Sequence, residues 1–195
     1  MSTPAASPKQ VLIEELRDYY EQIENIKEDV LELTAPLEDA QFNWRPARKQ
    51  WSISECLVHL NLADSLDLPA LSEEIERAHA AGWTGSGPFR YGFLSRKFVR
   101  WTEPPPKLRI KAPKWYVPLS DQPKETVVAE FISVHDRLLE LISKSNGLDL
   151  ARIKVPTPIR RVKFSLGQWF ALATAHDRRH LWQAWQVRKH ASFPV

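Results

Sequence analysis

The last part of the chain contains the stretch SLGQWFALATAHDRRHLWQAWQV, residues 165–187, in which apolar side chains recur at alternating spacings of three and four. This alternation places them on one face of a helix. The opening Ser-Leu-Gly-Gln has the capping-box pattern of a helix start. His176 and His180 occupy the same face as the apolar residues. The stretch therefore predicts a helix over 165–189 with two histidines turned toward the core.

The same alternation of apolar residues occurs three more times along the chain. It predicts further helices over 9–33, 52–81 and 124–145. The second of these begins with a Ser-x-x-Glu capping pattern and contains Pro69, which predicts a kink. Four long amphipathic helices without a convincing sheet predict an all-α fold, a four-helix bundle.

The segment 82–123 interrupts the helical pattern. Its prolines exclude a continuous helix, so we interpret it as a long Pro-rich insertion that crosses over between the second and third helices. A short helix near 93–101 and a minor hairpin near 107–117 are expected within it. A second irregular linker, which contains Pro156 and Pro158, precedes the last helix.

Length and composition limit the class of protein. The chain has 195 residues, 43% hydrophobic and 26% charged, as expected for one globular domain spanning 1–195. Residues 1–8 have the composition of a disordered lead-in and do not resemble an export signal. No apolar run reaches the ~18 residues of a membrane span. With one cysteine, Cys56, no internal disulfide can form, and we expect a cytoplasmic protein.

His176 and His180 are the first candidates for chemistry. A buried imidazole without hydrogen-bond partners costs ~1 to 3 kcal/mol, and two of them one turn apart can instead converge on one metal ion. Such a spacing also occurs in histidines that are hydrogen-bonded or lie on the surface, so the pair alone leaves both interpretations open. His59 lies on the inward face of the second helix and is a third histidine of this kind.

Two motifs together carry a family resemblance. The segment WSISECLVHL, residues 51–60, follows NWRP, and AHDRRHLWQ, residues 175–183, lies far downstream. This combination resembles the DinB superfamily of metal-binding four-helix bundles. The resemblance implies an up-down-down-up order of helices, one zinc or nickel ion held by His59, His176 and His180, and frequently a homodimer.

Three imidazoles leave at least one coordination position open, as expected for a reactive ion. Such an ion can activate a water or a thiolate. The resemblance implies a thiol S-transferase, and metal chemistry also suits a hydrolase, in each case with a small-molecule substrate that could be an anionic thiol. The alternative is a non-catalytic metal-binding or stress-response interaction module. No catalytic residue is assigned beyond the ligands.

Three other residues are candidates for the site. His135 lies beside the apolar face of the third helix. It could be a fourth ligand or hydrogen-bond to a ligand, but its place off the apolar row favours a helix-surface histidine, and we exclude it from the ligands. Cys56 is predicted to be a small core residue. Asp177, between the two histidines, invites comparison with His-Glu-x-x-His proteases. Aspartate is shorter than glutamate and the third ligand lies far upstream, so a protease is not predicted.

The net charge of +3 is modest, but positive charge is concentrated between residues 90 and 114. Such a cluster is most often a solvated surface, and it could also attract an anionic substrate. Aromatic residues in the same segment could stack on bases. No nucleic-acid-binding motif accompanies them, so neither nucleic acid nor membrane is expected as a partner.

Overall fold

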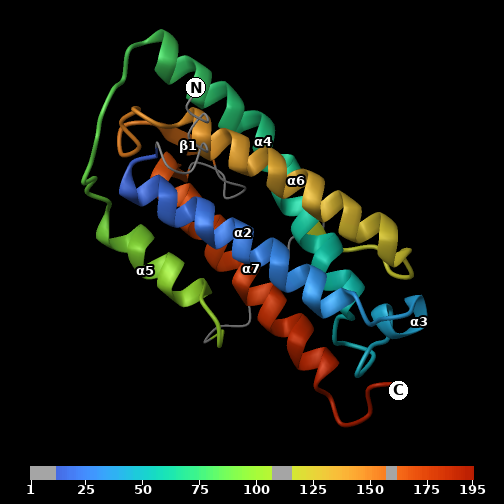
Figure 1. The fold of residues 1–195 in the computed structure, drawn as a ribbon. Helices are drawn as coiled ribbons and strands as arrows, with labels where there is room; N and C mark the ends of the chain where they lie inside the picture. The colour runs from blue at the N-terminus through green and yellow to red at the C-terminus, as the bar shows by residue number, and fades with distance from the viewer. Residues whose placement is uncertain (1–11, 107–115, 157–161) are drawn as a thin grey trace, which may run out of the picture.

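The computed structural model describes residues 12–106, 116–156 and 162–195, most of which are helical (Figure 1). The predicted disorder of residues 1–8 lies outside these described residues. So does most of the hairpin predicted near 107–117. Within the described residues, no helix is both long and apolar enough to cross a membrane.

Six helices account for most of the described structure: α2 (Glu14–Thr34), α3 (Asp39–Phe42), α4 (Ile53–Ala80), α5 (Phe93–Thr102), α6 (Lys124–Lys144) and α7 (Leu166–Arg188). The four long helices agree with the four predicted from periodicity, and α5 agrees with the short helix expected in the insertion. The prediction of an all-α fold is confirmed. Pro69 lies inside α4, which runs through it as a single helix.

The first helix begins later than predicted. The expected start was residue 9, whereas α2 begins at Glu14 after an extended Ile13. The amide of Ile13 donates a hydrogen bond to Oδ1 of Asn146, 3.1 Å away, in the turn after α6. This hydrogen bond joins segments 133 residues apart and holds Ile13 outside the helix. The pattern of apolar residues near residue 9 could not predict such a contact.

Two short strands stand where an irregular linker was predicted. β1 (Lys154–Pro156) pairs antiparallel with β2 (Lys163–Ser165), and Val155 faces Phe164 across the pair. Three residues are too few to show the alternation by which a strand is recognised in sequence. The pair leads directly into α7, whose N-cap is Ser165.

The four long helices share one apolar core. α2 and α4 each pack against both α6 and α7, and α5 packs against α7. Phe42, Phe131 and Phe170 are among the largest fully buried side chains of this core. The long helices lie side by side along most of their length in Figure 1. The contact of α4 with α7 brings the His59 segment beside the His176 segment.

Candidate metal centre

A network at the start of α4 fixes the position of His59. The amide of Glu55 donates to Oγ of Ser52 over 3.1 Å, and the amide of Ser52 donates to Oε2 of Glu55 over 3.0 Å. Arg45 also pairs with the Glu55 carboxylate, with its Nε 2.7 Å from Oε2. The predicted capping box is therefore confirmed. It anchors the first turn of α4, and His59 lies in the second.

The start of α7 is built differently from the prediction. Ser165 is the N-cap, but its hydroxyl donates to Oε1 of Gln168 over 2.9 Å and does not cap a backbone amide. The amide group of Gln168 is in turn bonded to the Ser95 hydroxyl at the start of α5. The predicted capping box is wrong here because the Gln168 side chain is hydrogen-bonded to the hydroxyls of Ser165 and Ser95. The helix still places His176 and His180 one turn apart.

The structure brings the three predicted histidines together. The ring centroids of His59, His176 and His180 lie 4.6 to 5.2 Å from one another. One ring nitrogen from each comes within 4.8 Å of the other two. His59 and His180 are buried and His176 is half-buried. The cluster is thus formed by one residue of α4 and two of α7, and His176 gives it an edge toward solvent.

Hydrogen bonding leaves Nε2 of His59 free to face the cluster. Nδ1 of His59 donates to the backbone carbonyl of Tyr116 over 2.7 Å, so the neutral ring carries its lone pair on Nε2. This atom lies 3.3 Å from Nε2 of His176. Two ligands on a tetrahedral ion with bonds of ~2.0 to 2.1 Å are about 3.3 Å apart. Nδ1 of the buried His180 has no hydrogen-bond partner among the described residues. The three residues fit a metal ion.

Burial keeps the three rings neutral, which metal binding requires. Desolvation lowers the pKa of His59, and it lowers the pKa of His180 well below the ordinary value. The pKa of His176 falls to about 4, through desolvation first and then repulsion from a charged His59. At neutral pH each ring therefore offers a lone pair.

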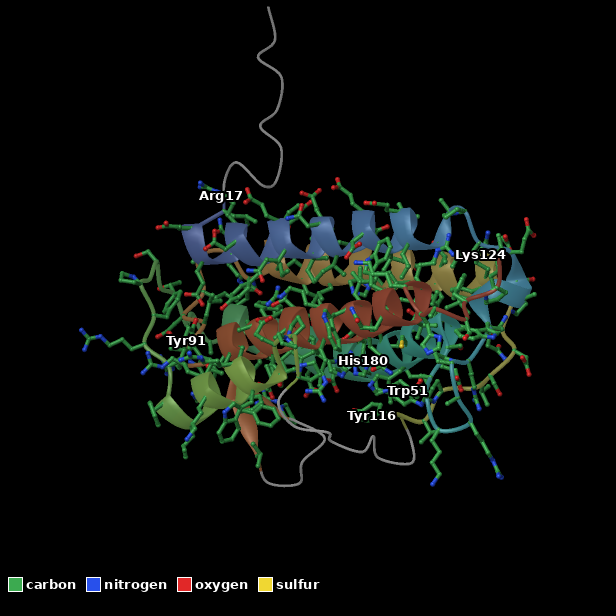
Figure 2. All side chains as sticks on the ribbon, turned by 90° about the horizontal axis from the view of Figure 1, so that it is seen from below. Arg17, Trp51, Tyr91, Tyr116, Lys124 and His180 are labelled. Atoms are coloured by element: carbon green, nitrogen blue, oxygen red, sulfur yellow. The ribbon has the colours of Figure 1, made fainter. Side chains whose placement is uncertain are left out.

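Trp51 covers two of the rings. Its indole stacks on His180 with ring centroids 5.6 Å apart and tilts over His59 at 4.9 Å. Figure 2 shows Trp51, His180 and Tyr116 gathered in one region of the molecule, away from Tyr91. An apolar wall of this kind limits water around the rings and strengthens electrostatic interactions there.

His135 is where sequence reasoning failed. It was predicted on the helix surface, but its side chain is fully buried and its Nε2 lies 3.3 Å from Oδ2 of Asp177. The helix α6 packs against both α2 and α4, so its buried face is wider than a single row of apolar residues. Position 135, one turn after the buried Phe131, could have indicated this. Cys56 is buried in the core as predicted, and burial raises the pKa of its thiol.

Two surface hollows lie away from the histidines. The larger, of about 770 Å³, runs between α2 and α7 and is lined by Asp29, Trp182 and Trp185 among others. The smaller, of about 460 Å³, lies by the C-terminal residues. Within the described residues, neither hollow is lined by any of the three histidines.

Comparison with models of protein families gives a match. A family model described as the DinB superfamily matches residues 22–184, a span that includes all three histidines. No curated protein and no solved structure matches significantly.

Proposed function

The chain belongs to the DinB superfamily, and on this premise we propose that it binds one divalent metal ion, zinc or nickel, through His59, His176 and His180. One observation carries the proposal. The Nε2 atoms of the buried His59 and the half-buried His176, whose rings are neutral, lie 3.3 Å apart, at the spacing of two ligands on one tetrahedral ion. The unpartnered Nδ1 of His180 supports the same conclusion.

We further propose that the ion serves a metal-dependent enzyme of the thiol S-transferase or hydrolase type. When bound, a divalent ion with three imidazole ligands supplies an open position at which water or a thiol loses its proton more readily. The half-buried His176 supports access of a small molecule to this position. Trp51 would keep the other side of the site apolar.

An anionic thiol is the proposed substrate class. The helix α5 presents exposed Arg96, Lys97 and Arg100 and packs against α7, which carries two of the three histidines. Positive charge near a site raises the local concentration of anions.

The competing proposal is a non-catalytic module in which the ion only stabilises the fold. It is favoured by the position of the two described hollows, neither of which includes a site histidine.

We also infer the finer organisation from the family. The long helices would follow an up-down-down-up order with 82–123 as the crossover insertion, in one domain. Contacts of α2 and α4 with both α6 and α7 support this order. We also propose that the protein forms a homodimer and that it lies in the cytoplasm.

The ligands can be tested one by one. His59→Ala, His176→Ala and His180→Ala should each lower the zinc content by about one ion per chain, because two imidazoles hold a divalent ion far less tightly than three. Protein purified without an affinity tag would be dialysed against zinc and analysed by mass spectrometry. His79→Ala and His190→Ala are matched controls, since both rings are exposed. Equal metal loss from all five variants would show that the site is misassigned.

The reaction class can be tested by a screen. Metal-loaded protein would be incubated with anionic and neutral thiols plus electrophilic acceptors, and separately with ester and amide substrates. Each reaction would be compared with the His176→Ala protein. Turnover that needs His176 and favours an anionic thiol would support the transferase. Equal rates with both proteins, or no turnover above background, would favour the non-catalytic module.

A further inference from the structure

A second cluster of ligating side chains lies in the core next to the three-histidine site. Asp64 of α4, His135 of α6 and Asp177 of α7 have exposures of 3%, 0% and 0%. One ligand atom from each lies within 4.8 Å of the other two. We propose that these three residues hold a second divalent metal ion, distinct from the ion of the histidine site.

The orientation of His135 supports a ligand role. Its Nδ1 donates to the carbonyl of Phe131 over 2.9 Å, which leaves Nε2 to face the two carboxylates. Nε2 is 3.3 Å from Oδ2 of Asp177 and 3.8 Å from Oδ2 of Asp64. His59 is held in the same way by the Tyr116 carbonyl. A ring whose Nδ1–H is fixed by a backbone carbonyl presents the Nε2 lone pair expected of a metal ligand.

The charges of the cluster also favour a bound cation. Asp64 and Asp177 are buried carboxyl groups, and within the described residues no lysine or arginine forms an ion pair with either. Oδ2 of Asp64 and Oδ1 of Asp177 have no hydrogen-bond partner there. A protonated His135 would balance only one carboxylate, whereas a divalent ion balances both and occupies the unpartnered oxygens. The competing arrangement is a proton shared by the two carboxyl groups.

The ligand types indicate which ion would bind. Two carboxylates and one imidazole suit manganese, ferrous iron or zinc, whereas magnesium and calcium prefer oxygen ligands alone. The three-imidazole site differs in having no negative ligand. Manganese would therefore favour the second site over the first. Occupation of the second site does not depend on the first.

The number of ions bound per chain tests the inference. The full-length protein would be dialysed against zinc or manganese and analysed by mass spectrometry. Wild type should bind two zinc ions, and Asp64→Asn should bind one, because asparagine keeps the shape of aspartate without its charge. His176→Ala combined with His180→Ala should also bind one, and the triple variant none. His135→Gln provides a second variant if Asp64→Asn shows an altered circular dichroism spectrum.

The possible results distinguish failure of the second site from failure of the histidine site. The second site would be overturned if wild type bound only one ion and the His176→Ala, His180→Ala protein bound none. This outcome needs no variant of the buried cluster. An Asp64→Asn protein that binds as many ions as wild type would also overturn the second site, because a shared proton would then explain the cluster. Two ions that both persist in the His176→Ala, His180→Ala protein would instead overturn the histidine site. Manganese bound by this double variant and lost with Asp64→Asn would support the second site.

Discussion

At the scale of single residues, burial decides the protonation state of the candidate ligands. The pKa of His176 is lowered to about 4, and those of His59 and His180 are lowered as well, in each case mainly by desolvation. Protons therefore compete with a metal ion only in more acidic solution than the reference histidine pKa of ~6.5 would suggest. Metal occupancy should persist below pH 6.

The same shift predicts how the stability of the metal-free protein depends on pH. Between about pH 6.5 and pH 4, His176 binds a proton in the unfolded chain but not in the folded one. The unfolded state binds more protons there, so stability falls as the pH falls, on the order of 2 kcal/mol for this partly exposed ring. Urea denaturation at several pH values would measure the loss.

A matched variant isolates the His176 contribution. Asp67 has the opposite effect on stability, in wild type and variant alike. Burial raises its pKa to about 6, so on acidification the folded state binds more protons than the unfolded state and gains stability. Because His176→Asn removes the imidazole that causes the loss, this variant should lose less stability than wild type on acidification. Parallel pH profiles of the two proteins would contradict the assignment.

The clustering of the three candidate histidines could be predicted from sequence at this scale, but their surroundings could not. His176 and His180 are recognised by their spacing on one helix face, and His59 by the family motif around it. The Tyr116 carbonyl that fixes His59 is supplied by a segment 57 residues away, with no local signal. The pairing of His135 with Asp177 likewise joins residues of two helices, and only their packing reveals it.

At the scale of elements, the start of α4 determines where His59 lies. Ser52→Ala removes the oxygen that accepts the Glu55 amide, and loss of such a cap costs ~1 kcal/mol. We expect that loss of stability in urea denaturation, together with weaker metal binding. Ser54→Ala is the control, because the buried Ser54 hydroxyl has no hydrogen-bond partner among the described residues and its removal should cost little. A larger effect at Ser54 than at Ser52 would contradict this account.

At the start of α7, the side chains of Tyr91 and Glu15 approach Gly167 closely. The Tyr91 hydroxyl donates to the Glu15 carboxylate directly over Gly167. A Cβ at this position would overlap the hydroxyl and lie 2.8 Å from Oε1 of Glu15. Gly167→Ala should therefore destabilise the fold by ~1 to 3 kcal/mol in urea denaturation, although alanine favours helix. Gly92→Ala, whose Cβ would lie 3.5 Å from the Ser95 hydroxyl, should be tolerated. Equal stability of the two variants would contradict this account.

At the scale of the whole molecule, periodicity identified the long helices because each buries an apolar face in one common core. Periodicity does not say which helices touch. The candidate ion would link α4 to α7, so its binding energy would add to the packing between these two helices. Any ligand that binds only the folded state stabilises that state by mass action.

This linkage predicts a metal-dependent melting temperature. Free metal at a hundred times its dissociation constant adds ~2.7 kcal/mol to the free energy of unfolding, which raises Tm by roughly 5 to 10 °C for a chain of this size. Chelator-treated protein would be melted with increasing zinc and followed by circular dichroism. The part of the shift due to the histidine site should disappear in His59→Ala and remain in His190→Ala, because only His59 belongs to the cluster. An equal shift in both variants would mean that the stabilising ion binds elsewhere. No shift in wild type would mean that the histidines hold no ion tightly enough to link α4 to α7.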